Sequence, residues 1–397
     1  MAKKKDRTEE KFAAVEETLS RTEQWVENNQ KTLSTIVFTI VGVIALFLAF
    51  DKFYLEPVNE RAQQKLFKSV NYFEADSFNL ALYGVNDEYG LLDIVDEYGS
   101  SDAGNLANYY AGISFLNMGD NESAIYYLSD FSCDDEVVSS IAFGSMGDAY
   151  MNIGEFEDAI NFWTKAAFNS KNNFTTPIYL KRAAMALEED GNIDRALEYY
   201  GKALNADTNH IRARLNRCSI YMAMDEGRKA LDDAEILLDL APNFTLARFR
   251  KAEAQMMLGE WSQARENLDI VLEKSPHHHQ ALTQLAACFI ALDRPERAET
   301  PLNEALRIAP DYAAAWHQRG LLYLEWGRHD NAMSDFEAAV KTDPHHLDSR
   351  LHIAAMHHEA EQFDVAAVAW RAVLQIDPDH LVAKTRLDEC EVKLMAQ

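Results

Sequence analysis

The sequence predicts an all-α solenoid built from a unit that repeats at a fixed interval, with one apolar helix near the N-terminus. Three observations predict this fold. Prolines recur at one constant spacing, at Pro242, Pro276, Pro310, Pro344 and Pro378. Alanines recur at the same spacing, at Ala230, Ala264, Ala298, Ala332 and Ala366. A run of eighteen residues without any charge spans positions 33–50.

The segment from Ala313 to Pro344 shows the repeating unit most completely. With Ala313 counted as position 1, the marked positions are 4, 8, 11, 15, 20, 24, 27 and 32, occupied by Trp316, Gly320, Tyr323, Gly327, Ala332, Phe336, Ala339 and Pro344. Small residues let two antiparallel helices approach, the glycine at position 15 permits a tight turn, and the proline ends the second helix. This pattern resembles the tetratricopeptide repeat, a helix–turn–helix unit of about 34 residues.

One such unit cannot bury its own apolar face, so a stack of neighbours is expected. The marked positions recur from Asn105 onward and predict about eight repeats over residues 105–380. We expect residues 51–104 to hold a linker helix and a degenerate capping repeat with an insertion. Residues 381–397 are expected to form a polar-faced helix that caps the last repeat.

The uncharged run at 33–50 predicts a transmembrane anchor. As a helix it would be about 27 Å long, close to the ~30 Å hydrocarbon core of a bilayer. Phe53 and Tyr54 follow it and would lie at the membrane interface. A cleaved signal peptide is the rival interpretation. However, residues 1–32 are too many for the charged first region of a signal peptide, and no small-x-small cleavage site follows the run. A buried helix of a soluble solenoid would show a polar face, and this run has none.

The orientation of this anchor rests on two opposing signals. Residues 1–32 form a charged tail, either solvated or folded as a short amphipathic helix. Near the membrane, Lys and Arg are fewer before the span than after it, which opposes a cytoplasmic N-terminus. A short tail and a single early span favour a cytoplasmic N-terminus. We therefore expect a single-pass protein of the bacterial inner membrane, with a cytoplasmic N-terminus and periplasmic repeats.

Composition limits the partners. Asp and Glu total 64 against 38 Lys and Arg, a net charge of −26, so nucleic acid is not expected as a partner because its phosphates would be repelled. Four cysteines (Cys133, Cys218, Cys288 and Cys390) stand far apart without a C-x-x-C motif. We expect core thiols, with neither a disulfide framework nor a zinc site.

The first half of the chain resembles a known family. The tail EETLSRTEQWVENNQK precedes the span, and FYLEP, YYAGISFLNMG and GDAYMNIG follow it. Residues 1–190 resemble the membrane-anchored tetratricopeptide proteins of Bacteroidota, which are similar to the ancillary subunit of the bacterial Sec translocon. The resemblance implies an exported repeat domain that contacts chaperones or translocating chains. That family's repeat domain usually ends near residue 230, whereas here five more repeats follow.

A cluster of basic residues predicts a peptide-binding groove. In co-chaperone repeats, the first helices of three successive units hold the C-terminal carboxylate of a peptide. Lys181, Asn216 and Arg250 match three of the five positions of that clamp, whereas Met185 and Leu246 do not. Arg212 and Arg217 would support the same groove. The alternative is that the arginine stems pack on the repeats and pair with neighbouring carboxylates.

The histidine clusters suggest metal binding, but the spacing does not support a built site. His277 to His279 and His345–His346 follow repeat-ending prolines, in loops. His352 and His357 are five residues apart and share a helical face poorly. No phosphate-binding glycine loop, H-E-x-x-H or G-x-S-x-G motif is present. We therefore expect no cofactor, no metal, no small-molecule substrate and no enzymatic activity.

The sequence thus predicts a non-enzymatic, membrane-anchored scaffold that binds peptide or protein segments. Its expected partners are translocon subunits or chaperones, and its expected role is to assist protein export or envelope assembly. The alternative is a structural adaptor that organises a membrane protein complex. The two functions differ in salt dependence, because a charged groove loses affinity as ionic strength rises.

Overall fold

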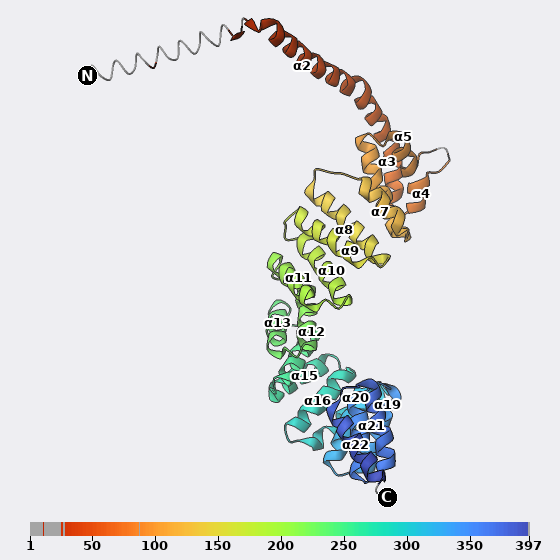
Figure 1. Cartoon of the computed structure of the whole chain (residues 1–397), viewed down its shortest axis with the longest axis vertical. Coiled ribbons are helices and arrows are strands. Elements are labelled where there is room, and N and C mark those ends of the chain that lie inside the picture. Colours follow the sequence, from red (N-terminus) through yellow and green to blue (C-terminus); the bar gives the residue numbers. More distant parts are fainter. Residues whose placement is uncertain (1–10, 12–24, 27, 87, 396–397) are drawn as a thin grey trace, which may run out of the picture. The chain divides into compact units, whose positions relative to one another are not determined.

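The computed structural model describes residues 11, 25–26, 28–86 and 88–395, and every regular element within these ranges is helical. Contacts divide the chain into two compact units, Met1–Lys171 and Asn172–Gln397 (Figure 1). The prediction of an all-α tetratricopeptide-repeat solenoid with one N-terminal apolar helix is confirmed. The charged tail 1–32 lies almost entirely outside the described residues.

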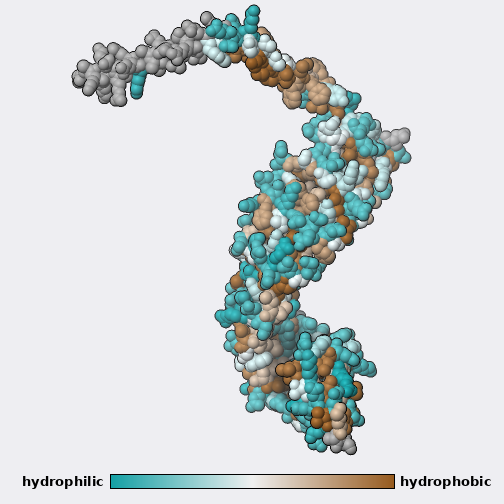
Figure 2. Space-filling view, viewed as in Figure 1, coloured by the Kyte–Doolittle hydropathy of each residue, from teal (hydrophilic) through white to brown (hydrophobic). Residues whose placement is uncertain are grey.

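The first unit begins with one continuous helix, Gln30–Glu74. It consists of α2 (Gln30–Phe50), a π-helical turn η1 (Asp51–Leu55) and α3 (Glu56–Glu74). The apolar window of this helix is long enough to cross a membrane and has no residue buried against the rest of the protein. Its apolar side chains are open to solvent (Figure 2).

Six further helices complete the first unit: α4 (Phe78–Tyr83), α5 (Leu91–Tyr98), α6 (Asp102–Met118), α7 (Asn121–Asp130), α8 (Glu136–Asn152) and α9 (Phe156–Asn169). Helices α3 to α6 share one core, in which Leu82, Leu91 and Ile94 are fully buried. The pairs α6–α7 and α8–α9 are helix–turn–helix units. The segment between α3 and α6 contains two short helices, where a regular repeat would have one longer helix.

The second unit alternates first helices and second helices of successive repeats. The first helices are α10 (Thr175–Glu189), α12 (Ile211–Ala223), α14 (Thr245–Met257), α16 (His279–Ala291), α18 (Ala313–Glu325) and α20 (Leu347–Glu359). The second helices are α11 (Ile193–Ala206), α13 (Gly227–Leu240), α15 (Trp261–Lys274), α17 (Glu299–Ile308), α19 (His329–Thr342) and α21 (Phe363–Ile376). Helix α22 (Leu381–Met395) packs against α21 and ends the array.

The spacing of small residues produces this packing. The alanines at position 20, from Ala230 to Ala366, are all fully buried. Gly320 lies so close to Phe336 of α19 that an added Cβ would be 2.6 Å from the ring atom Cε1. Gly327 turns the chain between α18 and α19 with a φ of +67°, a conformation that glycine adopts without strain. The roles expected of both glycines are confirmed.

One second helix is irregular, and its prolines explain why. The segment preceding α17 is a 3₁₀ turn, Pro295–Arg297. Pro301 lies in the first turn of α17, where a missing backbone N–H breaks no helical hydrogen bond. Helix α17 is therefore ten residues long, whereas α15 and α19 have fourteen.

Two expectations need correction. Cys218, Cys288 and Cys390 are buried free thiols, but Cys133 is exposed in the loop before α8, so it is not a core thiol. The outer face of α22 is mixed rather than polar. Asp388 is exposed at position 8, where other repeats bury a small residue, but Leu381 and Val392 are exposed as well.

Candidate functional site

The first helices of the second unit define one face of the repeat array, which we call the A-face. Helix α12 contacts α14, α14 contacts α16 and α16 contacts α18. The second helices of successive repeats show no comparable packing among the described residues of this unit. The first helices therefore stand closer together than the second helices, which makes the A-face the inner side of the stack.

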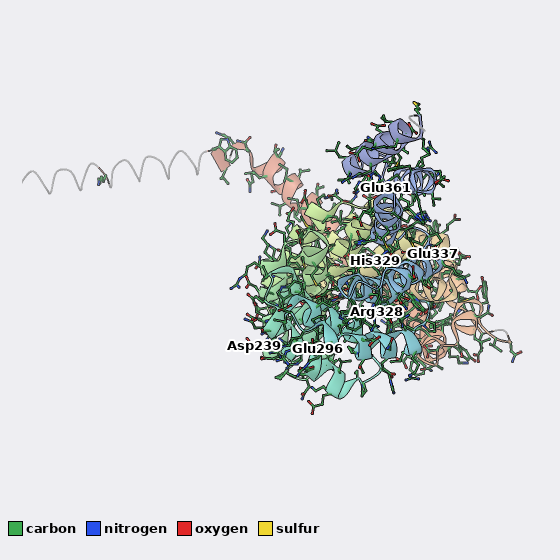
Figure 3. All side chains as sticks on the ribbon, turned by 90° about the horizontal axis from the view of Figure 1, so that it is seen from below. Asp239, Glu296, Arg328, His329, Glu337 and Glu361 are labelled. Atoms are coloured by element: carbon green, nitrogen blue, oxygen red, sulfur yellow. The ribbon has the colours of Figure 1, made fainter. Side chains whose placement is uncertain are left out.

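The second helices and turns carry exposed charged or polar side chains. Examples in Figure 3 are Asp239, Glu296, Arg328, His329, Glu337 and Glu361. The basic residues predicted to form a groove must therefore be assigned individually, either to the A-face or to contacts within the repeats.

Arginines at position 4 hold successive repeats together. Arg214, Arg248 and Arg350 each donate a hydrogen bond to the backbone carbonyl six residues earlier, in the loop that ends the preceding repeat. The donor–acceptor distances are 2.8, 3.1 and 2.9 Å. Trp316, the tryptophan at the same position, donates to the Pro310 carbonyl at 2.8 Å. These arginines therefore replace tryptophan in a structural contact.

Arg217 is bound within its own repeat. Its Nε and Nη2 atoms donate to the two oxygens of Asp233 on α13, at 2.8 and 2.7 Å, and this hydrogen-bonded carboxylate raises the pKa of Arg217. The buried Arg214 donates to the same carboxylate at 3.0 Å. Arg319 and Asp335 repeat the arrangement on α18 and α19. Arg217 is therefore directed toward α13.

Asn216 links three helices. Its Nδ2 atom donates to the hydroxyl of Tyr200 on α11 at 3.0 Å, and that hydroxyl donates to Glu188 of α10 at 3.0 Å. Tyr200 is fully buried, and burial raises the pKa of its hydroxyl. Asn216 therefore fixes α12 against the preceding repeat and has one oxygen left for a ligand.

Arg250 belongs to a chain of polar groups on the A-face. Its Nη1 atom donates to Glu253 Oε2 at 2.7 Å, and Gln284 Nε2 of α16 donates to Glu253 Oε1 at 2.7 Å. Two buried atoms of this chain, Arg250 Nε and Gln284 Oε1, have no hydrogen-bond partner among the described residues. A donor and an acceptor thus remain unused on neighbouring first helices.

The remaining two predicted residues lie on α10 and α12. Lys181 is half-buried. Arg212 is exposed at position 2 of α12 and forms no ion pair with any described carboxylate. In a protein with a net charge of −26, an exposed arginine without a carboxylate partner is available to bind an external anion.

Exposed apolar side chains accompany these cations. Met185, Leu246 and Met257 on α10 and α14 are 39, 38 and 37 % exposed. Methionine side chains are flexible and polarisable, and they adapt to partners of different shape. The A-face of α10, α12 and α14 therefore combines adaptable apolar side chains with arginine and lysine.

The structure also places the histidines. The described residues contain no group of three or more His, Cys, Asp or Glu side chains with metal-binding geometry. His317 is buried on α18, its Nδ1 lies 3.0 Å from Ser349 Oγ of α20, and burial lowers its pKa to about 4. His346 of the following loop lies beside it, with ring centroids 5.1 Å apart. The sequence indicated that His345 or His346 could approach a histidine of a first helix, and His346 does so.

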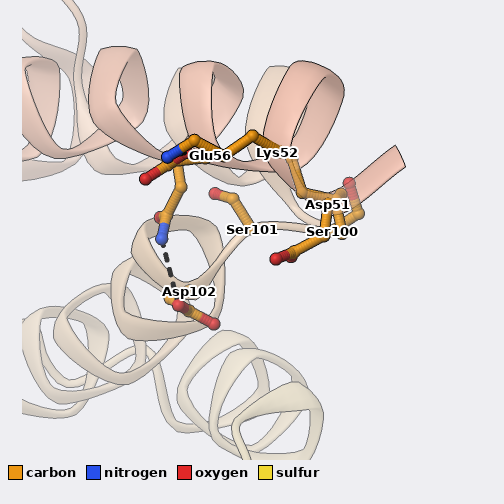
Figure 4. A pocket seen from close by; sticks show the side chains of 8 residues that line it. Asp51, Lys52, Glu56, Ser100, Ser101 and Asp102 are labelled. Atoms are coloured by element: carbon orange, nitrogen blue, oxygen red, sulfur yellow. Dashed lines mark hydrogen bonds and ion pairs between the residues drawn. The ribbon is translucent and has the colours of Figure 1, made fainter. Parts of the chain in front are cut away.

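Each of the two units has a hollow on its surface. An open apolar hollow of ≈ 440 Å³ is lined by Ile211, Ala241, Pro242, Asn243 and Phe244, at the joint between α12 and α14. In the first unit, a polar hollow of ≈ 390 Å³ lies where the apolar helix ends (Figure 4). There Asn59 donates to Asp102 at 3.0 Å and ties the start of α3 to α6.

Comparisons with known proteins identify the repeats. Models of the tetratricopeptide repeat match residues 177–210, 249–313 and 313–346. No curated protein matches this chain.

Solved structures of tetratricopeptide-repeat proteins resemble the chain at low identity. One from Parabacteroides merdae ATCC 43184 is 18 % identical, with 64 % of this chain and 98 % of that chain covered and a TM-score of 0.46. The C-terminal part of a repeat-containing protein from Cytophaga hutchinsonii is 14 % identical, with 70 % and 99 % covered and a TM-score of 0.44. The matched segments identify repeats of the second unit as tetratricopeptide repeats, and the fold is a tetratricopeptide-repeat solenoid.

Proposed function

We propose that this chain is a non-enzymatic, membrane-anchored scaffold whose A-face, at α10, α12 and α14, binds an acidic segment of a partner protein with apolar side chains. Tetratricopeptide repeats serve generally as protein-binding scaffolds. The observation that carries the proposal is Arg212, an exposed cation without a described carboxylate partner, on the same face as the exposed Leu246 and Met185.

Charge supports an acidic segment. Glu253 already accepts hydrogen bonds at both oxygens, and Glu188 accepts one from Tyr200. Arg212 has no such partner among the described residues and would attract an anion, most strongly at low ionic strength. Arg250 contributes through its unused Nε, whereas Arg217 is not part of the proposed contact because Asp233 binds it. Lys181 and Asn216 complete the proposed site.

The apolar helix Gln30–Phe50 supports anchoring in a membrane. With the resemblance of residues 1–190 to exported, anchored repeat proteins, it supports a role beside a translocon or chaperone in protein export or envelope assembly. In this arrangement the N-terminus is cytoplasmic and the repeats are periplasmic. The anchor would hold the A-face near emerging chains and raise their local concentration.

The test is photocrosslinking from matched positions in the native membrane. A photoreactive residue replaces Leu246 on the A-face or Ile236 on α13, because these side chains have similar exposure (38 and 40 %) but belong to a first and a second helix. We expect captured protein from position 246 and little from position 236. Equal capture from both positions would contradict binding at the A-face.

A charge reversal tests the chemistry of the contact. Arg212→Glu should reduce capture from position 246 by about tenfold, equivalent to about 1.4 kcal/mol. Arg228→Glu on α13 is the matched control, because Arg228 is also exposed. Mass spectrometry of the captured protein separates the roles. Translocon subunits or exported chaperones support export, whereas one unrelated membrane complex supports a structural adaptor.

A further inference from the structure

Four helices of the second unit begin with a histidine that caps the helix. The N-cap residues of α12, α16, α20 and α22 are His210, His278, His346 and His380. In each, the imidazole Nδ1 accepts a hydrogen bond from the backbone N–H three residues later. These donor–acceptor distances are 3.1, 3.2, 3.3 and 3.2 Å. His278 and His346, which the sequence analysis assigned to loops, thus lie at the start of helices.

The same position holds an aromatic ring in two other first helices. Phe244 and Tyr312 occupy the N-cap of α14 and α18, and neither provides a side-chain hydrogen bond to its helix. The ring is therefore common to this joint, and histidine adds an acceptor. The array contains capped and uncapped helices of otherwise similar design, which serve as internal controls for one another.

Only an unprotonated Nδ1 can accept this hydrogen bond. A protonated imidazole presents N–H groups on both nitrogens, so the N3 amide would lose its acceptor. The positive charge would also lie at the positive end of the helix dipole. An ordinary histidine titrates near pH 6.5, within the range that compartments of a cell reach.

We propose that these histidine caps make the repeat array acid-sensitive, because protonation at Nδ1 releases the first turns of α12, α16, α20 and α22 while α14 and α18 are unaffected. The inference does not depend on what the A-face binds. Below about pH 6.5 the first turns of the histidine-capped helices open more often, and the joints between repeats loosen.

The charged groups near the four caps differ. Three of the loops hold an aspartate three residues before the histidine, at Asp207, Asp343 and Asp377. The loop before His278 has Ser275 instead. Arg214 with Asp233 lies near the His210 loop, and Lys384 with Asp379 lies near His380.

The groups packed on the other two caps act in different directions. His278 packs against Phe249 of α14, with ring centroids 4.7 Å apart. Burial lowers the pKa of His278, the neighbouring His279 lowers it further, and Glu253 opposes this shift. His346 faces the buried His317 of α18, a second group that resists protonation. The cap of α20 contacts His317. Among the other three histidine-capped helices, we therefore expect the first turn of α16 to lose most stability in acid.

The sign follows from linkage. Consider a histidine whose pKa is lower in the folded state than in the unfolded state. At a pH between these two pKa values, the folded protein binds fewer protons than the unfolded chain. The stability that it contributes is complete above its unfolded pKa of about 6.5 and is lost as the pH falls toward the folded value. For His278, whose pKa is lowered, protection of α16 should decrease from pH 7.5 to pH 5.

The test is hydrogen exchange of the full chain in detergent at pH 7.5 and pH 5, corrected for the intrinsic exchange rate. We expect protection of the first turn of α16 to fall about fivefold, the factor for loss of one cap of about 1 kcal/mol. The first turn of α14, capped by Phe244, should keep its protection. Equal losses in α14 and α16 would overturn the proposal.

Two variants complete the test. His278→Asn retains a capping acceptor that does not titrate, so its α16 should keep the same protection at both pH values. His278→Phe reproduces the uncapped α14 and should show low protection at both. His329→Asn removes an exposed histidine that caps no helix by its side chain and should behave as wild type. Persistence of the full acid effect in His278→Asn would refute the role of the cap.

Discussion

The residue at position 15 of each repeat has a left-handed backbone whichever side chain it carries. The six φ values in the second unit lie between +58° and +77°, at Gly191, Asp225, Gly259, Asp293, Gly327 and Glu361. Aspartate tolerates this conformation because its short side chain can bond locally, but glutamate has no such advantage. The turn geometry is therefore imposed by the packing of the two helices.

Glu361→Gly should stabilise the protein. The left-handed conformation costs a residue with a Cβ about 1–2 kcal/mol, and glycine removes this strain. The greater conformational freedom of glycine in the unfolded chain offsets about 0.4–1 kcal/mol of the stabilisation. A net increase of about 0.5–1 kcal/mol should raise the urea midpoint for unfolding.

Gly327→Ala is the reverse control, because Gly327 has a φ of +67° and an added Cβ would meet nothing within 4 Å. It should lower the midpoint through backbone strain alone. An unchanged midpoint in both variants would show that the turn relaxes and that packing does not impose the angle.

The sequence predicted the tight turn where glycine marks it, at Gly327. It could not predict the positive φ of Asp225 and Glu361. Glycine signals such a turn in a sequence, but here packing forces another residue into the same backbone conformation. The histidine caps were missed for a related reason. Histidine is not among the usual N-cap residues, and only the hydrogen bonds from the backbone to Nδ1 reveal its role.

At the scale of helices, buried ion pairs join first to second helices. Asp233 of α13 is buried and accepts hydrogen bonds from both Arg214 and Arg217 of α12. Removal of this carboxylate would leave two guanidinium groups without their anion, one of them buried.

Asp233→Ala should therefore destabilise the second unit by about 3–5 kcal/mol, the usual cost of breaking a buried pair on one side. Asp232→Ala removes the neighbouring exposed carboxylate, whose ion pair with Arg228 is 3.6 Å long. That control should change the free energy of unfolding by less than about 0.5 kcal/mol. Chemical denaturation measures both, and a small effect of Asp233→Ala would mean that water solvates the released arginines.

The candidate site could be predicted in part from the sequence. Counting arginines on three first helices identified a basic cluster, and Arg212 remains free to bind an anion. The helical phase explains why two other arginines are not free to bind a ligand. Positions 4 and 7 lie on the same side of the first helix as the position-8 residue, which packs on the second helix. Arg214 and Arg217 hold those positions and are bound inside the repeat. The network of Arg250, Glu253 and Gln284 required coordinates, since it joins side chains from two successive repeats.

At the scale of the whole molecule, the constant repeat spacing determines the fold class, because every repeat buries the same positions against its neighbour. The period weakens between α3 and α6, where the chain packs two short helices into the core of the first unit. Sequence reasoning expected a degenerate repeat there, but side-chain volumes alone do not indicate how such a segment closes.

The apolar helix gives the prediction with the widest consequence. Val41→Lys with Ile44→Lys places two charges near the middle of α2, where each lysine opposes insertion by about 2.5–3.5 kcal/mol. The doubly substituted chain should move from the membrane pellet to the soluble fraction after carbonate extraction of cells. Phe67→Lys changes an apolar residue of α3 that is even more exposed than Val41 and Ile44, beyond the apolar segment, and should leave the chain in the pellet.

The outcome also separates anchoring from partner binding. If the A-face alone held the protein at a membrane complex, carbonate would release the wild-type chain, and in fractionation without carbonate Arg212→Glu would release the chain and the two lysines would not. If α2 spans the bilayer, the lysines release it and Arg212→Glu does not. Wild-type protein in the soluble fraction would contradict the anchor, and the apolar surface of α2 would then need a protein partner, since no residue of its apolar window is buried against this chain.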